Sequence, residues 1–162
     1  MLPPDAIKED LQLLRANILD FNPAVETYTP DFLPNAVELI RTVDSEMSIY
    51  AAFALISQMC AEANEGHFEL GTWTDPVHKD IRNDRAPFFP IAIYLVDDRI
   101  YVRGDFSNEG YLSPGDQIVS INGHSDQLIL DHLRKFVPSD GYIETYRDRQ
   151  IATSFPWLYY LY

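Results

Sequence analysis

Three observations predict an α+β fold, in which an N-terminal helical bundle precedes a small β-rich part with flanking helices. Apolar residues recur every three or four positions over the first 65 residues, as on the buried face of a helix. After Gly66 they alternate with polar residues, which is typical of a half-buried strand. Asn122 and Gly123 form the strongest hairpin-turn pattern in the chain. With 162 residues, 46% of them hydrophobic, the chain can bury the core of one domain or two small ones.

Three helices are expected in residues 1–66, which we take as a helical N-terminal domain. The first covers residues 5–20, where apolar side chains share one face at steps of four, three and four: Ile7, Leu11, Leu14 and Ile18. The second begins at Thr29, an N-cap residue followed by proline. The third begins at Asp44 or Ser45 and ends near Gly66.

Strands are expected in the next domain, residues 67–138. An alternating run predicts one over residues 67–73, and strand-like runs predict three more, over residues 88–96, 99–103 and 117–121. Asp97 and Asp98 separate two of these runs and suit a tight hairpin. Residues 74–87 are polar, with proline near each end, so we expect a long surface loop there.

Two helices should flank the strands. Ser125 caps the first, whose apolar residues are Leu128, Ile129, Leu133 and Phe136, and Pro138 ends it. The second covers residues 142–154, within a C-terminal helical segment of residues 139–162.

The chain ends in an apolar and aromatic run, whereas the terminus of a domain is usually polar. We therefore expect a chain cut from a larger protein, whose end packs on an absent domain or drives self-association. The run consists of Trp157, Leu158, Tyr159, Tyr160, Leu161 and Tyr162.

Composition restricts the partners. Twelve basic residues against 25 acidic ones give a net charge of −13, which disfavours nucleic acids and anionic membranes. No apolar run approaches the ~20 residues of a membrane-spanning helix. The single cysteine, Cys60, excludes an internal disulfide, and we expect it to be buried in a helix. Residues 1–5 hold no export signal, so either the protein is cytosolic or its start was trimmed.

Motifs for hydrolysis or metal binding are missing from the sequence. It has no Gly-x-Ser-x-Gly turn, and we expect none of its lysines (Lys8, Lys79 and Lys135) to be buried beside a serine. Its four histidines lack the His-Glu-x-x-His spacing of zinc peptidases. We therefore expect no catalytic residue, metal site or cofactor in this chain.

One polar cluster leaves an alternative open. Asp75, His78, Asp80 and Asp84 fit a solvated acidic loop, and the weaker alternative is a hydrolytic or metal-binding site. For His67, which follows Gly66, we favour a structural role at a helix end over catalysis.

Residues 112–123, LSPGDQIVSING, resemble the Leu-x-Pro-Gly-Asp-x-Ile-x-x-Ile-Asn-Gly stretch of PDZ domains, especially those of bacterial proteases. The physical chemistry fits this resemblance. Gly115 permits a tight turn, Asp116 can accept hydrogen bonds from turn amides, and Asn122 and Gly123 reverse the chain. The resemblance implies a small PDZ-like β-barrel within residues 67–138.

The wider pattern resembles tail-specific (C-terminal-processing, tricorn-like) serine peptidases. It comprises Glu9-Asp10-Leu11, Asn22-Pro23 and Glu65-Gly66-His67-Phe68, followed by the PDZ-like stretch. Such peptidases place their serine nucleophile and lysine base in a later domain. The resemblance therefore implies a non-catalytic region that positions or gates polypeptide substrate for a C-terminal catalytic domain, in an exported bacterial protein of the periplasm or cell surface.

In PDZ domains a peptide adds as a strand to the edge of the sheet. The resemblance places the corresponding segment at Phe88, Phe89, Ile91, Ala92 and Ile93. A core strand is the alternative for these residues, and Pro90 among them lacks an amide donor. The alternative function is a stand-alone PDZ-like peptide-binding or scaffold protein, and the length of the reading frame distinguishes the two.

Overall fold

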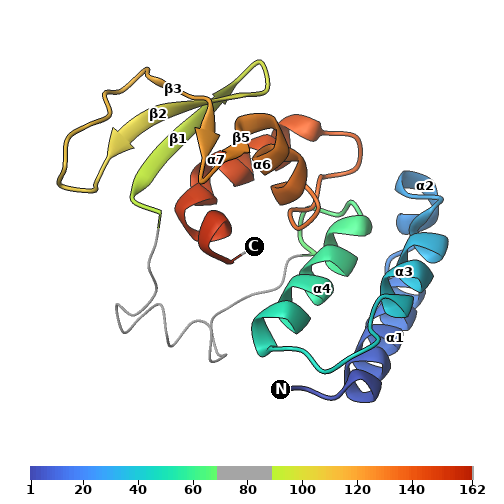
Figure 1. Ribbon diagram of the computed structural model, residues 1–162. Helices are drawn as coiled ribbons and strands as arrows, with labels where there is room; N and C mark the ends of the chain where they lie inside the picture. The colour runs from blue at the N-terminus through green and yellow to red at the C-terminus, as the bar shows by residue number, and fades with distance from the viewer. Residues whose placement is uncertain (69–88, 162) are drawn as a thin grey trace. The chain divides into compact units, whose positions relative to one another are not determined.

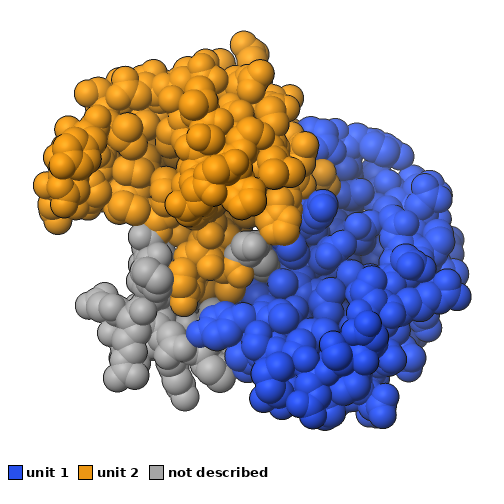
Figure 2. Space-filling view, viewed as in Figure 1, with its two compact units in different colours: residues 1–71, 135–144 blue, residues 72–134, 145–162 orange. Residues whose placement is uncertain are grey.

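The computed structural model describes residues 1–68 and 89–161, which belong to two compact units (Figure 1, Figure 2). Unit 1 consists of Met1–Gly71 and Lys135–Glu144, and unit 2 of Thr72–Arg134 and Thr145–Tyr162. Helices form the described part of unit 1, whereas unit 2 combines small antiparallel sheets with helices. The predicted α+β class is confirmed.

Unit 1 contains α1 (Pro4–Phe21), α2 (Val25–Tyr28), α3 (Phe32–Arg41) and α4 (Ile49–Glu62). The first agrees with the helix expected over residues 5–20. Thr29 does not begin a helix: its N–H donates to the carbonyl of Val25 at 2.8 Å and so closes the short helix α2. The N-cap of α4 is Ser48 instead of Asp44 or Ser45, because the Ser48 hydroxyl accepts the N–H of Ala51 at 3.1 Å.

The core of unit 1 joins one face of each long helix. Three members of the predicted apolar stripe on α1, Ile7, Leu11 and Ile18, are buried, and Leu14 packs against them at the edge. Their partners from later elements include Val25, Phe32, Ala36, Val43 and Met59. Burial of this stripe agrees with its spacing in the sequence.

Residues 135–144 follow unit 2 in the chain but belong to unit 1. The N–H of Gly141 donates to the carbonyl of Asn64 at 2.8 Å. The Tyr142 hydroxyl donates to the carbonyl of Thr27 at 3.1 Å, and its ring meets the ring of Tyr28 edge-on at 5.4 Å. These contacts fasten the returning chain to the helices.

Unit 2 is built on a three-stranded antiparallel sheet of order β1-β2-β3, formed by Ile91–Val96, Arg99–Asp105 and Gln117–Ile118. Strands β4 (Ser120–Ile121) and β5 (His124–Ser125) form a second antiparallel pair. The strand expected over residues 117–121 is thus split at Val119, which is exposed. The strands among the described residues do not close into a barrel.

Two helices complete the described part of unit 2, and Figure 1 shows them against one face of the larger sheet. The Ser125 hydroxyl caps α6 (Asp126–Leu133) as predicted, by accepting the N–H of Leu128 at 3.2 Å, but Phe136 lies beyond the helix end. Helix α7 (Glu144–Leu161) extends past the predicted residue 154 and through Pro156. Buried residues of the strands and of both helices make the core: Ile91, Ile93, Ile100, Val102, Ile129, Leu130, Leu133, Ile151, Phe155 and Leu158.

Some expectations fall outside the described residues. These are the loop over residues 74–87, with its cluster Asp75, His78, Asp80 and Asp84, and most of the strand expected over residues 67–73. Of that strand, His67 and Phe68 are described, and the Phe68 N–H donates to the Glu65 carbonyl at 2.9 Å, as in a turn.

Candidate functional site

The PDZ-like stretch forms a tight turn against β2. Gly115 has φ +96°, a backbone conformation that favours glycine, and its N–H donates to the Val102 carbonyl at 2.9 Å. The Asp116 carboxylate accepts the N–H of Ser113 at 2.8 Å, and the Asp116 carbonyl accepts the N–H of Val102 at 2.9 Å. Both residues therefore hold the approach to β3 in place.

Asn122 and Gly123 connect β4 to β5. Their φ angles of +53° and +84° are those of a two-residue hairpin turn of the primed type. The Asn122 side chain also donates from Nδ2 to the Tyr159 hydroxyl oxygen at 3.1 Å. This turn is thereby tied to the last turns of α7.

The residues expected to bind peptide contribute their side chains to the core. Ile91 and Ile93 are 4% and 1% exposed, and Ala92 is half-buried. The ring of Phe89 packs against Phe155 and Tyr159 of α7, with centroid distances of 5.6 and 5.0 Å. Phe88 lies outside the described residues. The described side chains thus belong to a core strand, which was the alternative to peptide binding. The backbone of β1 is therefore the part of this segment that is available to a ligand.

Pro90 is compatible with this sheet. It precedes β1, and its carbonyl accepts the N–H of Phe106 at 2.8 Å. Because a proline has no N–H to donate, it is tolerated at the beginning of an edge strand.

Strand β1 has an unpaired edge in the part of the chain that the structure describes, because it pairs only with β2. The register pairs Val96 with Arg99 across the two-residue turn of Asp97 and Asp98 (φ +48° and +58°). In such a hairpin the closing pair is hydrogen-bonded and alternate pairs are not. The backbone groups of Leu95, next to the closing pair, therefore point away from β2.

Two further residues of β1 follow the same alternation. Ile93 pairs with Val102, whose backbone is hydrogen-bonded to Gly115 and Asp116 on the other side of β2. The backbone of Ile93 therefore also faces the open edge. The register shifts between Ala92 and Ile93, but the extra residue lies in β2, and the Pro90 carbonyl points to the β2 side, where it accepts the N–H of Phe106, so the backbone of Ile91 faces the open edge too. Ile91, Ile93 and Leu95 together present three N–H donors and three carbonyl acceptors along one edge.

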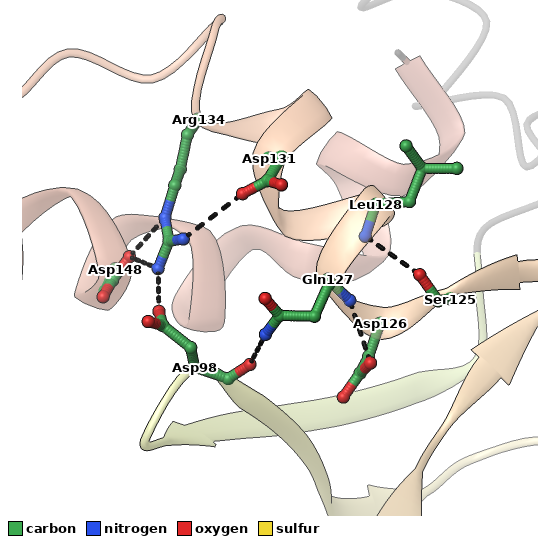
Figure 3. A network of polar contacts seen from close by, with 8 residues as sticks. All are labelled: Asp98, Ser125, Asp126, Gln127, Leu128, Asp131, Arg134 and Asp148. Carbon is green, nitrogen blue, oxygen red and sulfur yellow. Dashed lines mark hydrogen bonds and ion pairs between the residues drawn. The ribbon is translucent and has the colours of Figure 1, made fainter.

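A network of polar contacts fixes the elements around this edge (Figure 3). The Arg134 guanidinium donates to Asp148 of α7 at 2.9 and 3.1 Å and to Asp98 of the hairpin turn, and it pairs with Asp131 of α6 at 3.7 Å. Gln127 Nε2 donates to the Asp98 carbonyl at 2.6 Å. Burial acts to lower the pKa of Arg134, but hydrogen bonds and charge from Asp98 and Asp148 outweigh it and raise that pKa.

A cavity of about 480 Å³ lies beside α6. Helix α6 contributes one face to it, the β4–β5 turn contributes two polar side chains, and α7 contributes a phenol. The lining residues are Asn122, His124, Leu128, Ile129, His132, Leu133 and Tyr159. None of these belongs to β1.

Sequence reasoning did not find this cavity as a site. Asn122 was expected only to turn the chain, and His124 and His132 were considered only for the zinc spacing that they lack. The spacing of Leu128 and His132, one helical turn apart on the exposed side of α6, is the local pattern that could have pointed to it.

The described part of the chain holds no group of three or more histidine, cysteine or acidic side chains placed to bind a metal ion. His67 donates its backbone N–H to the Glu65 carboxylate at 3.3 Å, at the end of the helical region.

Within residues 1–68 and 89–161, no helix combines the length and apolar character needed to cross a membrane.

Comparison of the chain with models of protein families, with curated proteins and with solved structures finds no match in any of the three.

Proposed function

We propose that this chain is the non-catalytic N-terminal region of a tail-specific-type serine peptidase, and that it positions or gates polypeptide substrate. The proposal includes a PDZ-like β-barrel as the fold of unit 2. An extended segment of substrate adds as a further strand along β1, and cleavage takes place in a later domain of an exported parent protein.

The open edge of β1 carries the proposal. Its outward donors and acceptors lie on Ile91, Ile93 and Leu95, whose side chains are engaged in or near the core. A strand that adds there gains main-chain hydrogen bonds whatever its sequence, which suits a region that must accept many unfolded chains. The PDZ-like turn supports the same reading, because it fastens β2 and so keeps β1 in register.

The test uses Leu95→Pro, which removes one outward N–H, and Leu95→Ala as its matched control, which shortens the same side chain but keeps the donor. The probe is an acetylated and amidated octapeptide that alternates lysine and valine, since the chain is acidic. Loss of one donor leaves a peptide carbonyl unpaired, so we expect Leu95→Pro to weaken binding about tenfold more than Leu95→Ala. Thermal unfolding of both variants checks that they are folded.

A second probe separates strand addition from attraction by charge. The same octapeptide with the backbone nitrogen of all eight residues methylated keeps its charge but has no residue N–H to donate to β1 from either edge. We expect its binding to be lost. Equal binding of the two octapeptides, or equal effects of Leu95→Pro and Leu95→Ala in folded protein, would contradict strand addition.

A stand-alone PDZ-like binding or scaffold protein uses the same edge of β1 and is the second candidate. The native reading frame distinguishes the two. A continuation that encodes a serine and a lysine base supports the peptidase, whereas a stop codon after Tyr162 supports the scaffold. The binding experiment above applies to either.

A further inference from the structure

The cavity beside α6 is separate from the open edge of β1, because its walls come from α6, the β4–β5 turn and α7. From its lining we infer that it binds a small monocarboxylic acid with an apolar body, such as an aryl or branched-alkyl acid. This inference does not depend on peptide binding at β1, and it adds a second ligand site to unit 2.

The size of the cavity and its apolar walls indicate that the ligand has an apolar body. A volume of about 480 Å³ lies within the range of small-molecule sites in proteins. Ile129 and Leu133 are nearly fully buried and form an apolar floor, while Leu128 is 55% exposed and stands at the mouth. The half-buried ring of Tyr159 provides an aromatic wall. A ring or branched chain can therefore lose its hydration against these four side chains.

The polar side chains that line the cavity indicate that the ligand carries a carboxylate. The Tyr159 oxygen accepts from Asn122 Nδ2, so the hydrogen of its own hydroxyl is available as a donor. His124 adds an imidazole N–H group, and the Asn122 amide has a second hydrogen. A ligand that complements these donors brings acceptor oxygens.

The charge of the cavity lining differs from that of the whole chain, and this difference predicts which charge a ligand should carry. The chain carries a net charge of −13, so its overall field attracts cations. No carboxylate is among the described residues that line the cavity, however, and among these an ammonium group would meet histidine, asparagine and tyrosine instead of an acidic partner. The cavity should therefore prefer an acid to an amine of the same shape, although the net negative charge of the whole molecule favours the amine.

Isothermal titration calorimetry with three probes tests this preference. 3-Phenylpropionate has both the apolar body and the carboxylate, 3-phenylpropylamine has the body with the opposite charge, and acetate has the charge without the body. We expect 3-phenylpropionate to bind at least about tenfold more tightly than either of the others. Equal or tighter binding of the amine or of acetate, or no binding of 3-phenylpropionate at millimolar concentration, would overturn the inference.

Variants place the ligand in the cavity. Leu128→Trp fills the mouth, and Leu13→Trp is the matched control because Leu13 is a similarly exposed helical leucine, 61% exposed, on α1 of unit 1. We expect Leu128→Trp to abolish binding of 3-phenylpropionate and Leu13→Trp to leave it unchanged. In the unaltered protein, NMR signals of His132 and Tyr159 should shift on titration with 3-phenylpropionate, and binding without these shifts would overturn the assignment.

A capped tripeptide, acetyl-alanyl-phenylalanyl-alanine amide, distinguishes a free acid from the side chain of a polypeptide. It has the same phenyl group but no carboxylate. Weaker binding than 3-phenylpropionate supports a small-acid site. Tighter binding would assign the cavity to polypeptide side chains and overturn the inference.

Discussion

Two aspartates determine what β1 offers to a ligand. Asp97 and Asp98 both have positive φ, a conformation that aspartate adopts more readily than most residues. They make the two-residue turn that pairs Val96 with Arg99. Because this pairing alternates along the hairpin, the same two residues decide that Leu95 and Ile93 face the open edge. A one-residue change in the turn would present the other set of backbone groups.

Cys60 is a single residue that should make the stability of the protein depend on pH. It lies in α4, is 7% exposed, and burial raises the pKa of its thiol from 9.0 to about 11. The unfolded chain therefore loses this proton at a lower pH than the folded protein does. The contribution of Cys60 to stability is fully present below pH 9.0 and is lost as the pH rises toward about 11.

Replacement by alanine isolates this effect from other groups that titrate in the same range. We expect the free energy of unfolding of the unaltered protein to fall relative to Cys60→Ala by about 2 to 3 kcal/mol across that interval. Urea unfolding at a series of pH values measures the difference. A pH-independent difference between the two proteins would show that the thiol is not protected in the folded state.

At the scale of elements, Arg134 connects the β1–β2 turn with α6 and α7 (Figure 3). Its side chain is 22% exposed, and three carboxylates depend on it. Arg134→Met removes the positive charge that these three carboxylates share and leaves them close to one another. We expect a loss of about 2 kcal/mol in the free energy of unfolding, measured by urea titration.

Arg41→Met is the control for this prediction. Arg41 pairs only with Glu38 among the described residues, and both side chains are more than 70% exposed. Such a pair contributes about 0 to 0.5 kcal/mol, so this variant should be nearly neutral. Adding Asp148→Asn to Arg134→Met should restore part of the stability by relieving repulsion. Equal effects of the two arginine replacements would contradict the role given to the network.

The elements show which local patterns determine structure and which are overridden. The spacing of Ile7, Leu11 and Ile18 was sufficient to predict α1, because apolar residues three or four positions apart, or multiples of a turn, form one helical face that can be buried. The start of α4 was not predictable locally, because Leu2 and Met47 pair through two backbone hydrogen bonds of 2.8 and 3.2 Å and keep the residues before α4 out of the helix.

Helix α7 illustrates the same limit. Its continuation through Pro156 departs from the usual effect of proline in a helix interior. Phe155 and Leu158, on either side of it, are buried, and this burial offsets the lost hydrogen bond. Of the aromatic residues that follow, Trp157, Tyr159 and Tyr160 are helical and half-buried, and self-association through the aromatic run stays a prediction.

At the scale of the whole molecule, the two parts of unit 2 that could bind ligands differ in how far the sequence reveals them. Strand β1 was predicted within residues 88–96, since its apolar run and the Asp97–Asp98 turn are both local, and peptide binding along its edge stays a prediction. The cavity depends on the contact between Asn122 and Tyr159, which are 37 residues apart. Nothing in the local sequence of either residue indicates that contact.

Amide hydrogen exchange of β1, with and without the octapeptide of alternating lysine and valine, tests strand addition most directly. A strand on the open edge should slow exchange at Ile91, Ile93 and Leu95, whose N–H groups face outward. Exchange at Tyr94 and Val96, whose N–H groups already face β2, should change little. Peptide binding that protects both sets equally, or neither set, would contradict the proposal that this protein receives polypeptide along β1.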